Sequence, residues 1–327
     1  MISEAALAPY LSGEDTPELR ARVAALYAEQ QASWPRLGEA VAGLAEVEYK
    51  RLAVRGSEVL AQFNPQRIVS TAARVDAAAI RERPCFLCAD HLPPEEKGIA
   101  FGQDFVILCN PFPILRRHLV IAARGHTPQV IAGHFGVLLD LAQALGPEYF
   151  AIYNGPACGA SAPDHLHFQA CSREMLPLVG EVKHWPRREV AQIVDGEVAT
   201  LRSYRINLLV ARGSERSAIA AWFERSLAHL SALTGASPEP MLNLGVTCDR
   251  EWKVFLFPRG KHRPACYDAE GEAKLTVSPA AIDLAGVLVV PEASHFARIN
   301  ERDAERIYSE VTLDETRFGK LIEACAN

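Results

Sequence analysis

The chain has 327 residues, of which 49% are hydrophobic and 23% charged, an ordinary balance for a soluble globular protein. Its formal net charge of −6 argues against a general affinity for nucleic acid or anionic lipid, so an anionic ligand would need a local cluster of donors. The first residues lack the regions of a signal peptide, and no apolar run approaches a membrane span in length. The eight cysteines are therefore expected to be reduced, and the protein to be cytoplasmic.

The first part of the chain predicts a helical segment followed by a strand-rich unit. Residues 1–56 are expected to form the N-terminal helical segment, with a helix over 16–36 that begins at the sequence Thr-Pro-Glu. Residues 57–200 are expected to form the first unit. Its strands are expected at 57–63, 105–109, 118–123, 149–154 and 165–171. Its helices are expected at 76–83 and at 127–145, the second starting at Thr127-Pro128.

A second unit, over residues 201–290, repeats this order of elements without the paired histidines of the first. Its strands are expected at 205–211, 241–247 and 253–258, and its helix at 214–234. Residues 291–327 are expected to form a helical tail. The repeat is one of pattern alone, and it predicts an α+β fold of two halves, each with an antiparallel sheet flanked by helices. No low-complexity linker separates the halves, so we expect them to share a core or an interface.

The most informative segment, residues 164–169, reads Asp-His-Leu-His-Phe-Gln. Alternate side chains of a β-strand share a face, so His165, His167 and Gln169 would point into one site with two apolar residues behind them. A half-buried strand with satisfied histidines is the plain alternative. Against it, the preceding run, residues 154–163, holds two glycines and two prolines, which suggests backbone close to a ligand.

Within that run, Ser161 and the backbone N–H groups around Gly159 and Ala160 can form a small anion-binding concavity. A plain turn is the default interpretation of a glycine-rich loop. Its position directly before the two histidines favours a phosphate site instead.

Cys85 and Cys88 form a C-x₂-C pair with three interpretations: a redox dithiol, half of a zinc site, or buried cysteines. His126 and His165 are suitably placed to complete a tetrahedral set of two sulfur and two nitrogen ligands, which favours structural zinc. Two nearby histidines are alternatives to His126: His91 and His118.

His167 cannot bind the same metal as His165 without distorting the strand, because it lies about 6–7 Å further along. It is therefore free to act as a nucleophile at phosphorus if a backbone carbonyl holds its other nitrogen. Gln169 could donate its amide N–H to a phosphate oxygen. A neutral Gln stabilises developing charge without activating water, unlike a third histidine, and so favours transfer over hydrolysis.

The second unit holds a cluster of potential cations at the end of an apolar strand: Arg259, Lys261, His262 and Arg263. A solvated turn is the plain interpretation. A cation cluster at a strand end would instead suit a second phosphate or a sugar phosphate. Lesser candidates for the same role are Arg67, Arg116 and Arg117.

On these residues the chain resembles the transferase branch of the histidine-triad superfamily. That branch includes galactose-1-phosphate uridylyltransferase, diadenosine tetraphosphate phosphorylase and GDP-L-galactose phosphorylase. Its signature, His-x-His-x-Gln, is similar to residues 165–169, whereas the true hydrolases have a third His in place of the Gln. The likeness spans roughly residues 60–172 by motif, and 200–265 only by the order of elements.

The resemblance implies a role for each candidate residue and two histidine-triad-like halves. The zinc ligands would be Cys85, Cys88, His126 and His165. The catalytic residues would be His167, Gln169, Ser161 and Asn154. The nucleotide would be held by Asn110, Phe112 and Gly159, and the acceptor phosphate by Arg67, Arg259, Lys261, His262 and Arg263.

Two departures limit what is inherited. Asp164 stands where the uridylyltransferases usually have Pro, and the glycine loop is one residue longer. Their second metal site has no counterpart among the motifs of this chain. The substrate pair of the uridylyltransferases is therefore not carried over.

The sequence thus predicts a nucleotidyltransferase or phosphorylase acting on a nucleoside diphosphate sugar or a dinucleoside polyphosphate through a nucleotidyl-His167 intermediate. The alternatives are a nucleotide hydrolase of the same fold and a non-catalytic, zinc-stabilised nucleotide-binding protein. The partners would be these nucleotides and a phosphate or sugar phosphate, with neither nucleic acid nor membrane. The base, the sugar and the acceptor stay open, and so does a homodimer, which is common in this branch.

Overall fold

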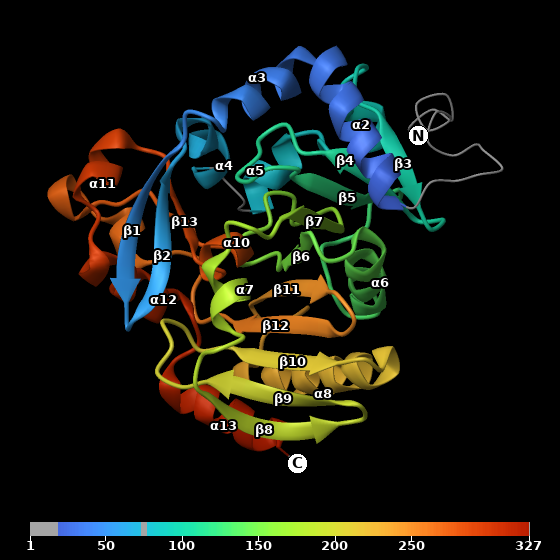
Figure 1. The fold of residues 1–327 in the computed structure, drawn as a ribbon. Helices are drawn as coiled ribbons and strands as arrows, with labels where there is room; N and C mark the ends of the chain where they lie inside the picture. The colour runs from blue at the N-terminus through green and yellow to red at the C-terminus, as the bar shows by residue number, and fades with distance from the viewer. Residues whose placement is uncertain (1–18, 73–76, 327) are drawn as a thin grey trace.

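A computed structural model describes residues 19–72 and 77–326, which are arranged around one ten-stranded antiparallel sheet (Figure 1). From one edge to the other, the strands are β3 (Gly98–Phe101), β4 (Phe105–Cys109), β5 (Leu119–Ala123), β7 (His167–Ser172), β6 (Tyr149–Asn154), β11 (Leu242–Cys248), β12 (Trp252–Pro258), β10 (Leu209–Gly213), β9 (Gly196–Leu201) and β8 (Arg187–Ile193). The two predicted halves therefore form a single continuous sheet.

The strand order is that of two similar halves that meet where β6 pairs with β11. In each half, a three-stranded meander is followed by a helix and a hairpin, and the last hairpin strand pairs with the last meander strand. The pairing of the strands also corresponds between the halves. Leu119, the first residue of β5, pairs with Ala170 of β7, and Leu209, the first residue of β10, pairs with Leu256 of β12. The predicted α+β pseudo-repeat is confirmed.

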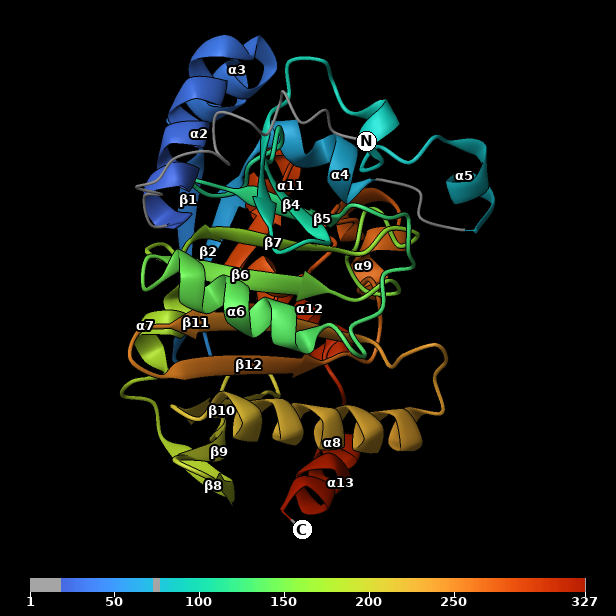
Figure 2. The ribbon, with the colours of Figure 1, turned by 90° about the vertical axis from the view of Figure 1, so that its right-hand side faces the viewer.

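The helices that cover one face of the large sheet are α2 (Leu19–Ser33), α6 (Phe135–Leu145), α8 (Arg216–Thr234) and α13 (Glu315–Cys325). In Figure 2, α6 and α8 stand in front of the strands. Their apolar side chains and those of the sheet form one core, in which Phe135 of α6 stacks on Phe223 of α8 with ring centroids 3.9 Å apart. This packing joins the two halves on that face.

A three-stranded sheet covers part of the opposite face. Its strands are β1 (Glu48–Val54), β2 (Ser57–Phe63) and β13 (Val287–Val290), with β13 parallel to β2. It packs with four helices: α7 (Pro177–Glu181), α10 (Ala281–Leu284), α11 (Ala293–Arg298) and α12 (Glu301–Val311). Their shared core includes Phe150, Phe255 and Phe257, so this layer lies over the centre and the second half of the large sheet.

Over the first half, the same face is covered differently. A small cluster joins Cys85 and Leu87 to Val106, Leu108 and Ala122 of the sheet. The polar end of β7 lies beside this cluster and outside the three-stranded layer. Shorter elements complete the fold: α3 (Pro35–Gly43), η1 (Pro65–Arg67), α4 (Ile68–Thr71), α5 (Ala77–Glu82), η2 (Ala89–His91), α9 (Ala265–Asp268) and η3 (Gly271–Ala273).

The strands predicted at 57–63, 105–109 and 149–154 have the predicted bounds, but other boundaries were wrong. The helix predicted over 16–36 ends at Ser33, because Pro35 begins α3; residues 16–18 lie outside the described part. The helix predicted over 127–145 begins only at Phe135. Strand β7 begins at His167 rather than at residue 165, and β10 begins at Leu209 rather than at 205.

Five strands of the described residues were not predicted: β1, β3, β8, β9 and β13. Strand β1 lies within the segment expected to be helical, and it forms a hairpin with β2. The hairpin of β8 and β9 lies between the two predicted units. Within the described ranges, each helix is too short or too polar to span a bilayer.

Candidate active site and metal centre

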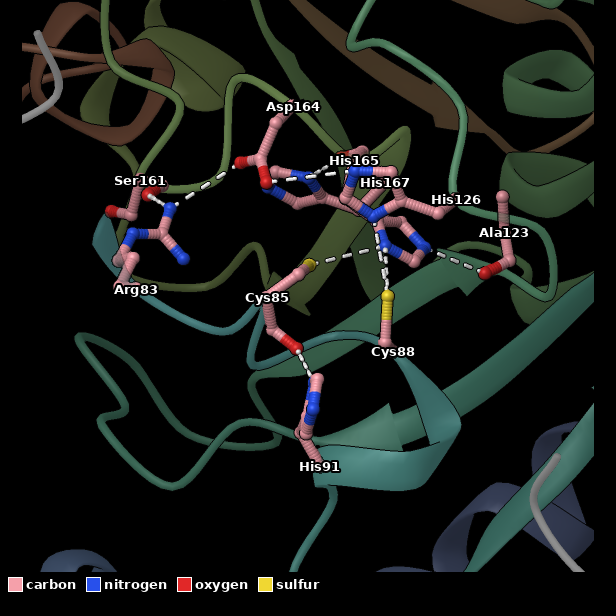
Figure 3. Close-up of polar contacts among 10 residues, drawn as sticks. All are labelled: Arg83, Cys85, Cys88, His91, Ala123, His126, Ser161, Asp164, His165 and His167. Atoms are coloured by element: carbon pink, nitrogen blue, oxygen red, sulfur yellow. Dashed lines mark hydrogen bonds and ion pairs between the residues drawn. The ribbon is translucent and has the colours of Figure 1, made fainter. Parts of the chain in front are cut away.

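Four predicted metal ligands lie together: the ligand atoms of Cys85, Cys88, His126 and His165 are all within 4.8 Å of one another (Figure 3). His165 Nδ1 is 3.3 Å from Cys85 Sγ, and His126 Nδ1 is 3.2 Å from Cys88 Sγ. Tetrahedral bonds of zinc to nitrogen and sulfur would separate the ligand atoms by about 3.3–3.8 Å. Burial raises the pKa of Cys85, but hydrogen bonds with His165 and backbone N–H groups outweigh it and lower it to about 6.

Contacts outside this cluster select the nitrogen that each histidine offers. His165 Nε2 donates to the carbonyl of Ala123 at 2.8 Å, so Nδ1 is the nitrogen that faces the thiols. His126 Nε2 lies 3.8 Å from a carboxylate oxygen of Asp164. Asp164 is thus a partner of one of the candidate metal ligands.

The two alternatives to His126 have other contacts. His91 Nδ1 donates to the carbonyl of Cys85 at 2.9 Å, which supports the loop of the cysteine pair rather than the cluster. His118 lies on the strand side of the site and contacts Gln169. The structure therefore brings His126, and neither alternative, into the group of possible ligands.

His167 is buried at the start of β7, and its Nδ1 lies 2.8 Å from the carbonyl oxygen of His165. A carbonyl can only accept, so Nδ1 carries the hydrogen and Nε2 keeps its lone pair. Burial lowers the pKa of His167 to about 4, and the imidazole is therefore neutral at pH 7. This is the state that a nitrogen nucleophile requires.

The side chain of Gln129 holds the backbone at this point. Strands β6 and β7 pair only as far as Ile152 with Gln169. Beyond that pair, Gln129 Nε2 donates to the carbonyls of Asn154 at 2.9 Å and His167 at 3.0 Å, and its Oε1 accepts from the N–H of His167 at 2.7 Å. Sequence reasoning missed this residue, because it falls in the segment predicted to be helical.

The amide of Gln169 is oriented by His118, which is fully buried. His118 Nδ1 accepts from the backbone N–H of Ile114 at 3.1 Å, so its Nε2 carries the hydrogen and donates to Gln169 Oε1 at 2.9 Å. Burial lowers the pKa of His118 to about 4, which keeps this arrangement at neutral pH. The Nε2 amide of Gln169 is left as a donor.

The amide of Asn154 is oriented in a similar way. Its Oδ1 accepts from Asn243 Nδ2 at 2.8 Å and from the backbone N–H of Ala281 at 3.0 Å. Its Nδ2 is left as a donor, like that of Gln169. Both amides line the smaller of the two cavities at this site.

Two cavities meet at Arg67, Ser161 and Gln169, which line both. The larger, of about 600 Å³, is also lined by His167 and by aromatic side chains that include Phe112. The smaller, of about 70 Å³, is lined by Asn154, Gly159, Arg263 and residues near α10, among others. The site thus consists of a large, partly apolar cavity and a small polar cavity, and Gln169 lines both.

Comparison with known proteins agrees with this arrangement. Residues 26–172 match a family model described as a domain of unknown function (DUF4922), and residues 182–327 match the GDPGP1-like C-terminal domain. Yeast Ap4A phosphorylase Apa2 in complex with Ap4A is 11% identical, with a TM-score of 0.58 over 86% of this chain and 97% of that chain. The chain therefore has the fold of yeast Ap4A phosphorylase Apa2.

Other matches are similar or weaker. Apa2 in complex with AMP is 12% identical, with a TM-score of 0.57 over 86% of this chain and 96% of that chain. An ADP-glucose phosphorylase from Arabidopsis thaliana with bound ADP-glucose is 12% identical over 82% of this chain and 100% of that chain, with a TM-score of only 0.37. No curated protein matches the sequence. At these identities the likeness to Apa2 shows a shared fold and no more.

In the glycine-rich loop, residues 154–163, Gly159 packs closely against Ala280. Gly159 has a φ of +124°, and a Cβ built there would lie 2.6 Å from the Cβ of Ala280. Only glycine fits both conditions. Ser161 follows, with its carbonyl accepting from Arg83 at 3.1 Å.

The predicted cation cluster does not act as one group. Arg259 is 1% exposed and donates to buried oxygens, so it is structural rather than a free phosphate ligand. Lys261 is exposed and lines neither cavity. Burial lowers the pKa of His262 to about 4, so this residue is neutral rather than cationic at pH 7. His262, Arg263 and Arg67 line the smaller cavity.

Of the three predicted nucleotide-binding residues, Asn110 and Phe112 line the larger cavity, whereas Gly159 lines the smaller one. Asn110 Oδ1 accepts from the backbone N–H of Phe112 at 2.8 Å, which fixes a tight turn after β4. The guanidinium of Arg36 lies 4.5 Å from the centroid of the Phe112 ring. Arg36 and Trp34, which both line this cavity, carried no motif that could have identified them from sequence.

Proposed function

We propose that this protein is a nucleotidyltransferase or phosphorylase that uses a covalent nucleotidyl-His167 intermediate. The observation that carries the proposal is the neutral imidazole of His167, held at Nδ1 by a carbonyl with Nε2 beside a cavity of about 600 Å³. The proposed substrate is a nucleoside diphosphate sugar or a dinucleoside polyphosphate. The fold of yeast Ap4A phosphorylase supports this class of enzyme.

The larger cavity would take the nucleoside, because its volume and aromatic lining are typical of small-molecule sites. Asn110 and Phe112 would contact the base or ribose. The α-phosphate would then lie between His167 and the amide donors of Gln169 and Asn154. Ser161 would add a further donor at the same phosphate.

In the first step, Nε2 of His167 attacks the α-phosphorus and forms an N–P bond. The P–O bond to the departing nucleotide or sugar phosphate breaks, and the leaving group takes that electron pair. The positive charge that develops on the imidazole is stabilised by its Nδ1–H bond to the carbonyl of His165. The amides of Gln169 and Asn154 stabilise the charge on the phosphoryl oxygens.

In the second step, an oxygen of the acceptor phosphate or sugar phosphate attacks the same phosphorus. The N–P bond breaks and His167 returns to its neutral form. Arg67 and Arg263 of the smaller cavity would hold the acceptor, and Arg67 is suited to this because its Nε has no hydrogen-bond partner among the described residues. Two displacements predict ping-pong kinetics and retained configuration at phosphorus.

We propose structural zinc at Cys85, Cys88, His126 and His165. The donor set, the spacing and the outer contact of His165 all fit a tetrahedral ion. Bound there, zinc would fix the cysteine loop to the segment before β7. A thiolate site of this kind also fits the reducing environment of the cytoplasm, where we place the protein.

The proposal is tested by incubating the protein with nucleotides labelled at the α-phosphate, with and without inorganic phosphate. We expect acid-labile label on the protein, and faster product release when phosphate is added. With a nucleoside diphosphate sugar as the donor, the product would be the nucleoside diphosphate. Kinetics that require a ternary complex would contradict the covalent intermediate.

The same experiment separates the two alternatives. A hydrolase would release nucleoside monophosphate at a rate independent of phosphate. A non-catalytic binding protein would bind nucleotide without transferring label. The Gln at position 169, where hydrolases have a third histidine, favours transfer over hydrolysis.

A further inference from the structure

A buried polar chain runs from the second half of the sheet to the candidate site. Asn243 of β11 is fully buried and lies directly opposite Asn154 of β6 in the pairing of the two strands. Its Nδ2 donates to Asn154 Oδ1 at 2.8 Å and to the carbonyl of Cys158 at 2.9 Å. Its Oδ1 accepts from Arg259 Nη1 at 2.5 Å.

Arg259 sets the direction of the hydrogen bonds that link it to Asn243 and Asn154. A guanidinium only donates, so Asn243 must turn its oxygen toward Arg259 and its NH2 group toward Asn154. Asn154 must in turn direct its oxygen toward Asn243. The NH2 group of Asn154 then points away from Asn243. It is free to donate into the smaller cavity, which Asn154 lines.

Arg259 is itself held without freedom to reorient. Its guanidinium also donates to the carbonyls of Val311 at 2.9 Å, Pro279 at 2.9 Å, and Lys261 and His262 at 3.0 Å each. These carbonyls belong to several different segments. The guanidinium of Arg259 is therefore held in one orientation, and it fixes the orientation of the amides of Asn243 and Asn154.

Packing alone does not require an amide at position 243. In the register that relates the two halves, Asn243 of β11 corresponds to Phe150 of β6, because each lies one residue before the partner of Leu256 or Ala170. Phe150 belongs to the apolar core. A buried amide at this point costs free energy unless its hydrogen bonds are satisfied, which suggests a role beyond packing.

We propose that Asn243, fixed by Arg259, is a positioning residue that directs the amide donor of Asn154 toward the phosphoryl group. The second half, which lacks the nucleophile, would thereby orient part of the active site. This inference rests on the proposed function for its kinetic readout. Its structural claim, the orientation of the Asn154 amide, can be tested without any activity.

The kinetic test is a double-mutant cycle on single-turnover transfer of label to the protein. Asn243→Asp keeps the size and the acceptor for Arg259, but it places an oxygen opposite Asn154 Oδ1. We expect the rate to fall about 100-fold, as for loss of one oriented donor. In an Asn154→Ala background, the same change should cost less than about threefold, because the amide that it orients is gone.

Asn207→Asp is the matched control. Asn207 is a half-buried amide of the second half, bonded to the carbonyl of Leu313 at 3.1 Å. We expect it to change the rate less than about twofold. If Asn243→Asp does not fold, Asn243→Ala takes its place in the same cycle. Losses that multiply in the double variant would overturn the proposal.

The test that needs no activity is NMR of the side-chain amides. The Asn154 NH2 signals are assigned by their loss in Asn154→Ala. We expect Asn243→Asp to shift them and to speed their exchange with solvent, while Asn207→Asp leaves them in place. Unchanged signals in Asn243→Asp would refute the orienting role. A positive NMR result without label transfer would refute the proposed function alone.

Discussion

The two halves of the large sheet share a register but differ in what covers them. His167 and Gln169 of β7 correspond to Lys253 and Phe255 of β12, because they lie three and one residues before the equivalent pairs at Ala170 and Leu256. Phe255 is buried under the three-stranded layer, and Lys253 forms an ion pair with Glu251.

This difference between β7 and β12 shows that the repeated strand arrangement is not sufficient to form a binding site. In the first half, the corresponding face is left to the cysteine loop and two cavities, so polar groups at the end of β7 meet open space. In the second half, the position of Gln169 is taken by Phe255, which belongs to the core under the three-stranded layer.

The largest expected effect comes from removing the nucleophile. His167→Ala should lower label transfer by at least about 10⁴-fold, the scale seen when a nucleophile is deleted. Lys253→Ala, at the corresponding position of the second half, should leave transfer unchanged. Both are measured as single-turnover label on the protein. Equal losses in the two variants would remove the distinction between the halves.

Removing the metal ligands should come next. The double change Cys85→Ser and Cys88→Ser should abolish bound zinc, measured by elemental analysis, and lower the melting temperature. Cys325→Ser, a half-buried cysteine outside the cluster, is the control and should keep the metal. A wild-type protein that folds fully with less than about 0.1 zinc per chain would show that the cysteines only pack.

A smaller effect is expected at His118, which corresponds to Leu208 of the second half by the register of β5 and β10. His118→Leu should slow transfer about 10- to 100-fold, because Gln169 loses the donor that fixes its oxygen. The loss should nearly disappear in a Gln169→Ala background. His295→Leu, at another buried histidine, should lower stability without slowing transfer.

The smallest expected effect is on the pH dependence of stability. Burial lowers the pKa of both His118 and His167 to about 4, below the ordinary 6.5. The unfolded chain therefore binds protons between these values that the folded chain does not, and the free energy of unfolding falls as pH drops from about 6.5 toward 4. Above pH 6.5 it should not change through these groups.

Urea unfolding between pH 8 and 4.5 measures this dependence. The His118→Leu variant should lose less stability over the acidic range than the wild type, because one of the two buried histidines is gone. Parallel curves for the two proteins would contradict the lowered pKa of His118. The comparison cancels the contribution of metal-ligand protonation, which both proteins share.

Much of the site could be predicted because its motifs are local. The pair Cys85 and Cys88 and the alternating residues 165–169 have fixed spacings whose chemistry is limited. The choice of His126 among three histidines was predicted and agrees with the cluster in the structure. Hydrophobic periodicity also predicted most strands and helices of the two halves in their order, but it missed β3, β8 and β9.

What could not be predicted depends on contacts between distant segments. Residues 127–134 have the composition of a helix start, but Gln129 binds two strands and holds them as a loop. Arg259 looks like a surface cation in sequence, yet it is buried by carbonyls that lie far along the chain. Strand β13 pairs with β2 across more than 200 residues, which no local pattern indicates.

The bond between Gln129 and His167 has a consequence for local opening. The N–H of His167 is held by a side chain rather than by a neighbouring strand. This N–H can exchange with solvent when one side chain rotates, whereas the N–H groups that follow in β7 require a strand to separate. The backbone N–H of the proposed nucleophile can therefore open locally while the strands beside it stay paired.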